Sequence, residues 1–139
     1  MDEKDLQNAL VMYQLLQNQF EQLQRQAAFL QNRYTELEAT RQSLEAAESM
    51  AAAGEILLPL GSGVFMHGSG QAKEPLLMDI GAGILVKKTQ KEATALVEKQ
   101  KSEVEQQSAK LSQELMAVAS HINQLGSQLQ AAMNPPEKK

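Results

Sequence analysis

Residues 55–88 read EILLPLGSGVFMHGSGQAKEPLLMDIGAGILVKK and hold most of the glycines of the chain. The apolar residues of this stretch fall into four short runs, which predict strands over residues 55–60, 64–67, 75–80 and 84–87. A short turn that contains glycine separates the first run from the second, at Gly61-Ser62-Gly63, and the third from the fourth, at Gly81-Ala82-Gly83. Short glycine-containing loops between apolar runs are typical of β-hairpins. We therefore expect two hairpins, joined by residues 68–74.

The predicted strands are apolar in continuous runs and do not alternate with polar residues. Strands of this kind are covered on both faces, and an isolated two-stranded hairpin is marginal in water. Pro59 suits an edge or a bulge better than a central strand. The hairpins are therefore expected to oligomerise, through Ile56, Leu58, Leu60, Val64, Phe65, Met66, Leu76, Leu77, Met78, Ile80, Ile84 and Val86.

The segments on either side of the hairpins have the composition of long helices. Seven of the eight glycines lie between Gly54 and Gly83, so residues 1–53 contain neither glycine nor proline. From Leu6 onward, apolar residues recur at alternating steps of three and four, which predicts a coiled-coil seam. Leucine occupies five successive d positions, and residues 94–132 continue the same repeat. We expect two helices that pair antiparallel, with the hairpins inserted between them in an α+β fold.

Capping residues predict where these helices end. Gly54 suits the left-handed residue that closes a helix, and Thr89 with Glu92 forms a capping-box pattern. The second helix is expected to end at Asn134, before two prolines. The chain is thus interpreted as a single unit made of four segments: helix 1–53, hairpins 54–88, helix 89–134 and tail 135–139.

Antiparallel pairing places an a residue of one helix beside a d residue of the other, which allows a test of register. If the numbers of paired residues sum to 138, Leu16 meets Ile122 and Leu23 meets Leu115, whereas Leu37 meets Lys101 nearer the hairpins. A shift by one heptad aligns the seam equally well. Polar seam residues lower stability but can define register.

Little in the chain indicates catalysis or a cofactor. It has no cysteine, and neither His67 nor His121 has a second histidine or a carboxylate at metal-ligand spacing. The glycine turns lead into strands and complete no phosphate-binding motif. Glutamates two residues apart, such as Glu36 and Glu38, are interpreted as solvated. We therefore expect no enzyme activity, no cofactor and no metal site.

The charge distribution and the length of the apolar runs bear on cellular location and on binding to nucleic acid or membrane. The net charge is −4, and lysine and arginine are not clustered as nucleic-acid binding requires. No apolar run approaches the roughly 20 residues that span a bilayer. The N-terminal MDEKD has no signal-peptide character. We therefore expect a cytoplasmic protein that binds neither nucleic acid nor membrane.

Apolar residues outside the seam gather near both chain ends. Leu10, Val11, Met12 and Leu15 lie at e, f, g and c positions. Exposed apolar patches usually mark interaction sites, and methionine and leucine adapt to partners of varied shape. With the last layers of the seam, they form a predicted binding surface that contains Leu6, Leu10, Val11, Met12, Leu125, Leu129 and Met133.

Across its whole length the chain resembles the alpha class of the prefoldin family. The resemblance rests on the EILLPLGSGVFMHG and LLMDIGAGILVKK segments, and on two hairpins where the beta class has one. It implies a hexamer of two alpha and four beta subunits, whose hairpins form a double β-barrel with a central alpha pair. It also implies an ATP-independent chaperone, whose coiled-coil tips bind unfolded proteins and deliver them to a group II chaperonin.

A different class of function is also compatible with the residues. A coiled-coil scaffold or tether could carry the same helices and hairpins while binding one folded partner. Titration against several unrelated unfolded proteins would distinguish the two hypotheses, because a scaffold should bind few of them.

Overall fold

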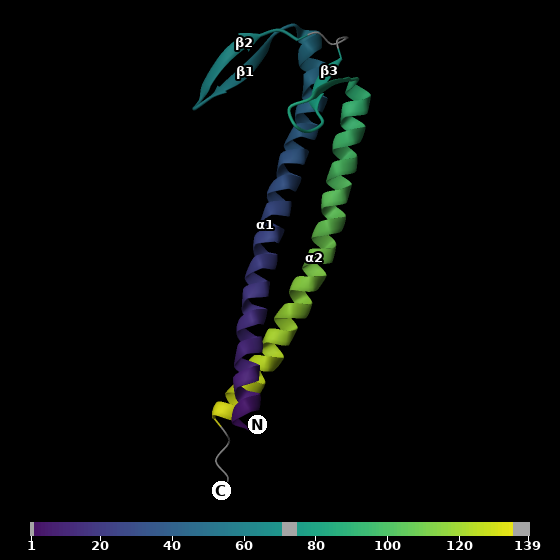
Figure 1. Cartoon of the computed structure of the whole chain (residues 1–139). Helices are drawn as coiled ribbons and strands as arrows, with labels where there is room; N and C mark the ends of the chain where they lie inside the picture. The colour runs from purple at the N-terminus through teal and green to yellow at the C-terminus, as the bar shows by residue number, and fades with distance from the viewer. Residues whose placement is uncertain (1, 71–74, 135–139) are drawn as a thin grey trace. The chain divides into compact units, whose positions relative to one another are not determined.

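The structure is a computed structural model that describes residues 2–70 and 75–134, except the side chains of residues 48 and 50–53. Part of the predicted hairpin connection and the predicted tail 135–139 lie outside the described residues. The elements follow one another as α1 (Glu3–Ala53), β1 (Ile56–Gly61), β2 (Val64–Gly68), β3 (Leu76–Asp79), β4 (Leu85–Lys88) and α2 (Gln90–Met133). Two long helices with two small hairpins between them confirm the predicted element order (Figure 1).

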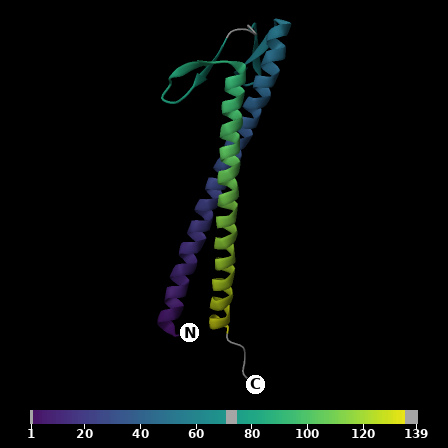
Figure 2. The same ribbon diagram turned by 90° about the vertical axis from the view of Figure 1, so that its right-hand side faces the viewer.

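Contacts divide the chain into two compact units. Unit 1 comprises Met1–Asn32 and Glu105–Lys139, and unit 2 comprises Arg33–Val104. Unit 1 therefore holds the first part of α1 with the second part of α2. Within it, the two helix segments lie side by side in both views (Figures 1 and 2).

The seam of unit 1 is apolar. Its core is a cluster of four buried residues, Leu16, Leu23, Leu111 and Val118. Partly buried apolar residues from both helices pack around this cluster: Phe20, Ala27, Leu30, Leu115, Ile122 and Leu125. All ten occupy predicted a or d positions, so the structure confirms the heptad assignment in this unit. The ring of Tyr13 lies 3.4 Å from the point where a Cβ on Gly126 would stand, which agrees with the register expected from the sum of 138.

The seam of unit 2 mixes apolar and charged residues. Leu37, Val97 and Val104 are buried. Lys101, at a predicted a position, contacts Glu38 of the facing helix segment and lies over the ring of Tyr34, with 5.3 Å from its Nζ to the ring centroid. These contacts place position 38 opposite position 101, so the register found in unit 1 also holds here.

The helix ends form as the capping residues predict. Gly54 adopts a φ of +82° after the last residue of α1. At the start of α2, the Glu92 N–H donates to Thr89 Oγ1 over 3.1 Å, and the Thr89 hydroxyl donates to the Glu92 carboxylate over 3.1 Å. The cap satisfies an N–H that has no partner within the helix. On the described residues, α2 ends at Met133, one residue before the predicted end.

Each hairpin is a separate two-stranded antiparallel sheet, β1 with β2 and β3 with β4. Ser62 and Gly63 both have positive φ, at 51° and 78°, as the two central residues of a tight hairpin turn require. The register of β1 shifts between Pro59 and Gly61, so the structure confirms that Pro59 lies next to a bulge.

The strand ends differ from the predicted ones by one residue at most positions. Pro75 and Ile80 lie outside β3, and Ile84 lies outside β4. At Ile80 the reason is the second turn, which begins earlier than predicted because the Asp79 carboxylate accepts a hydrogen bond from the Gly81 N–H over 2.8 Å. An aspartate that bonds two residues ahead stabilises a turn in place of a strand.

Neither long helix is apolar enough over its described length to cross a membrane.

Candidate functional site

Between Leu10 and Leu16, α1 carries apolar side chains at every heptad position except that of Gln14. Leu10, Val11, Met12 and Leu15 lie outside the seam and are 43–59% exposed, while Tyr13 and Leu16 face the seam. A surface helix normally confines its apolar residues to the face that packs, so apolar residues outside that face form a surface suited to contact with another molecule. We name the exposed set, with Met133 of α2, the tip surface: Leu10, Val11, Met12, Leu15 and Met133.

The seven residues predicted to bind at this end do not all lie in one environment. Leu10, Val11, Met12 and Met133 are exposed, whereas Leu6 and Leu125 are half-buried. Leu129 is only 6% exposed because it packs in the seam. The structure therefore presents four of the seven side chains as open surface, and Leu129 contributes through the packing beneath it.

The hairpins expose the apolar side chains that are predicted to oligomerise. Seven of them are more than half exposed: Leu60, Val64, Phe65, Met66, Leu77, Ile80 and Ile84. Leu58 is 39% exposed. Ile56, Leu76, Met78 and Val86 are half-buried. Each two-stranded sheet leaves apolar side chains in water, so these side chains are available for contact with another chain.

Charged residues in the seam of unit 2 form a cluster that the sequence interpretation missed. Glu38 was expected to be solvated, but it is half-buried and accepts hydrogen bonds from both Arg41 and Lys101. Arg41 also contacts Glu45 and Glu98. Glu38 is partly buried because position 38 adjoins the seam at the layer where the facing a residue is Lys101. An acidic residue three positions before an a-position arginine is the signal that could have found it.

Hydrogen bonds from Arg41, and then from Lys101, lower the pKa of the Glu38 carboxyl from 4.5 to about 2. The same contact with Glu38 raises the pKa of Arg41 and that of Lys101. A group that is held ionised in this way is a poor proton donor or acceptor near neutral pH. The cluster therefore serves pairing between the helices better than it could serve acid–base chemistry.

The two histidines lie on exposed parts of the surface. His67 Nδ1 lies 3.0 Å from a Glu55 carboxylate oxygen, at the start of the first hairpin. His121 lies on the exposed face of α2. Within the part of the chain that the structure describes, no three histidine, aspartate or glutamate side chains are grouped as a metal ion would need. What the described surfaces offer is apolar contact area and not reacting groups.

A profile of the prefoldin subunit family matches residues 15–134 of this chain, from α1 through both hairpins to α2. The chain belongs to the prefoldin family. This is a family of non-enzymatic chaperones. The chain matches no curated protein significantly.

Among solved structures, the prefoldin fold of this chain is similar to the cryo-EM structure of filamentous PFD from Methanocaldococcus jannaschii. The two share 20% sequence identity with a TM-score of 0.64, over 88% of this chain and 98% of that chain. The similarity covers most of both chains, so it supports the fold.

Proposed function

We propose that this prefoldin subunit is an ATP-independent chaperone that binds unfolded polypeptides at its tip surface. The observation that carries the proposal is the exposed apolar end of α1 in a chain of this family. Unfolded proteins expose apolar side chains, and burial of such area releases about 25 cal/mol per Å². Leucine and methionine side chains adapt to segments of different shape, which suits a chaperone with many clients.

The proposal includes assembly through the hairpins. An alpha-class subunit would pair with a second alpha subunit and four beta subunits, and the exposed hairpin residues would become the interior of a β-barrel. Such an assembly would hold several tip surfaces together, and multivalent contact strengthens the capture of one long chain. Transfer of the captured protein to a group II chaperonin, in the cytoplasm, completes the proposed role.

The test separates the tip surface from assembly. Leu10, Val11, Met12 and Leu15 are each replaced by glutamine, which keeps helix propensity while it removes the apolar surface. The control is Met116→Gln, since Met116 is 67% exposed in the same unit but lies outside the tip surface. Aggregation of several unrelated denatured proteins is measured by light scattering, and particle mass is measured with and without beta subunits.

We expect the fourfold variant to assemble with beta subunits as the wild type does but to lose most suppression of aggregation, while Met116→Gln retains it. Unchanged suppression by the fourfold variant would contradict the tip assignment. Binding of one folded partner, with no suppression for unrelated denatured proteins, would identify a scaffold instead. Failure to form a particle with the mass of a hexamer would contradict the proposed assembly.

A further inference from the structure

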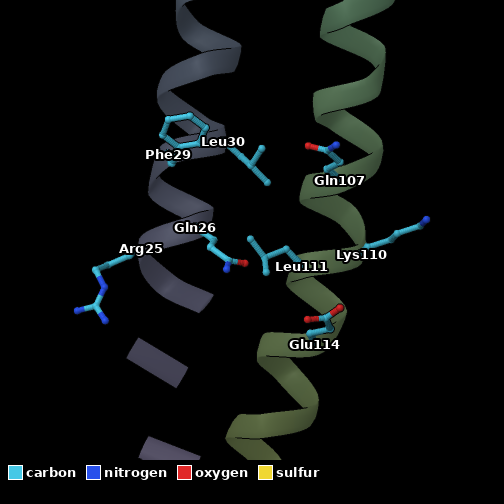
Figure 3. Close-up of a pocket in the computed structure, with 8 residues that line it drawn as sticks. All are labelled: Arg25, Gln26, Phe29, Leu30, Gln107, Lys110, Leu111 and Glu114. Atoms are coloured by element: carbon cyan, nitrogen blue, oxygen red, sulfur yellow. The ribbon is translucent and has the colours of Figure 1, made fainter. Parts of the chain in front are cut away.

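A second apolar surface lies beside the helix pair of unit 1, away from the tip surface. It is an open groove of about 560 Å³ lined by residues of both helices. In Figure 3, Leu30 of α1 and Leu111 of α2 extend toward one another and form the apolar floor. Phe29 lies at the α1 side and is 70% exposed.

Phe29 is the unusual residue of this groove. The other two aromatic residues of unit 1, Tyr13 and Phe20, occupy a positions and are half-buried in the seam. Phe29 falls at a c position, which faces outward, so packing of the helix pair does not explain it. Aromatic side chains contribute strongly where they become buried between two proteins. An exposed phenylalanine next to an apolar floor is therefore suited to receive an apolar side chain from a partner.

The charge around the groove is opposite to that of the unit. Among its described residues, unit 1 carries six acidic side chains but only three basic ones. Two of those three, Arg25 and Lys110, line this groove. In Figure 3 they extend from different helices to opposite sides, so they flank the apolar floor.

Neither cation is neutralised within the described part of the chain. No ion pair there involves Arg25 or Lys110. Glu114 also lines the groove, so its lining carries two positive charges and one negative charge. A partner with carboxylates would meet unpaired cations on both sides, whereas a basic partner would meet a single carboxylate.

We propose that this groove binds an acidic amphipathic peptide segment of a partner protein, with an apolar side chain on the Leu30–Leu111 floor beside Phe29 and carboxylates toward Arg25 and Lys110. The inference does not rest on the tip surface, because none of its residues lines the groove. It adds a lateral docking surface with a charge preference to the proposed chaperone activity.

The probes are three synthetic peptides of equal length with one central leucine. The residues on both sides of the leucine are glutamate in the first peptide, glutamine in the second and lysine in the third. Binding to the full-length chain is measured by fluorescence anisotropy at low salt, where exposed charges are least screened. We expect the glutamate peptide to bind about three- to tenfold more tightly than the glutamine peptide, as two exposed ion pairs allow, and the lysine peptide to bind least.

Variants locate the binding. Phe29→Gln should weaken all three peptides, and Arg25→Gln with Lys110→Gln should abolish the preference for glutamate. Glu114→Gln should strengthen binding of the glutamate peptide, because it removes the only carboxylate of the groove. The controls are Lys4→Gln, which removes the third cation among the described residues of unit 1, and Met116→Gln, which removes an exposed apolar side chain elsewhere. Neither control should change the affinities.

Equal affinity for the three peptides, or the same effect from Lys4→Gln as from the Arg25 and Lys110 variant, would overturn the inference. Loss of peptide binding in the fourfold tip variant, with no loss in Phe29→Gln, would assign the peptides to the tip surface instead. Helix content by circular dichroism shows that each variant remains folded, which is expected because all of the substituted side chains lie on the surface. Failure of this inference would leave the proposed chaperone function untouched, since that function is tested by aggregation.

Discussion

The helix pair has two different seams, an apolar one in unit 1 and a partly charged one in unit 2. In unit 1, Leu16 faces Ile122, and a shift of one heptad in either direction would bring it beside Leu115 or Leu129 instead. All three partners are apolar and similar in size. The apolar seam therefore stabilises the pair strongly but distinguishes poorly between registers.

The charged seam of unit 2 has the opposite properties. A shift of one heptad would place Thr94 or Ser108 opposite Glu38 in place of Lys101. In either case the carboxylate would lose a cation that now donates to it. Arg41 of the same helix would still pair with Glu38, but loss of the Lys101 contact would make the half-buried carboxylate less favourable. We infer that the apolar seam supplies stability and the charged seam supplies register.

The largest expected effect is a cavity in the apolar seam. Leu23→Ala removes buried side-chain volume from the core cluster, so we expect the free energy of unfolding to fall by about 2–5 kcal/mol. Urea denaturation followed by circular dichroism measures the loss. The matched control is Leu15→Ala, because Leu15 is 57% exposed and its truncation leaves no cavity. Equal losses in both variants would contradict the assignment of stability to the seam.

A smaller effect of opposite sign is expected at Gly126, inside the apolar half. Glycine costs a helix interior about 1 kcal/mol relative to alanine. A Cβ at this position would meet the Tyr13 ring at 3.4 Å, which is ordinary contact. Gly126→Ala should therefore raise the free energy of unfolding by up to about 1 kcal/mol, measured in the same denaturation experiment. A loss of stability would mean that the ring requires the bare glycine, and the apolar seam would then be more selective than we infer.

The smallest effect on stability at neutral pH is expected from the charged seam, since its side chains remain partly exposed to solvent. Glu38 has a pKa lowered from 4.5 to about 2, so the folded state favours its ionised form. Its contribution is fully present above the unfolded-state pKa and is lost as pH falls toward about 2. The difference in melting temperature between the wild type and Glu38→Gln should therefore shrink steadily between about pH 5 and pH 2. A difference that stays constant over this range would exclude the ion pairs as its cause.

Most of the fold could be predicted because its signals are local. A seven-residue repeat, residues that cap helices and glycines confined to turns each act within a few positions of the chain. The tip surface was predictable for the same reason, since Leu10, Val11 and Met12 fall outside the repeat and remain exposed. Phe29 also falls outside the repeat, and the heptad position alone could have indicated its exposure. The groove beside it was not predictable, because half of its lining comes from residues about 80 positions away.

Periodicity and turn chemistry are enough to define the two helices, the two hairpins and the apolar residues outside the seam. Which residues face one another across the seam is known only from how the helices pack. Apolar layers repeat every seven residues, so several registers satisfy the sequence equally well. The contacts of Glu38 with Lys101 and of Tyr13 with Gly126 select one of them. Contacts between distant positions depend on the geometry of packing, and that geometry is what brings together Glu38, Arg41 and Lys101 in one half and places Arg25, Phe29 and Lys110 along one groove in the other.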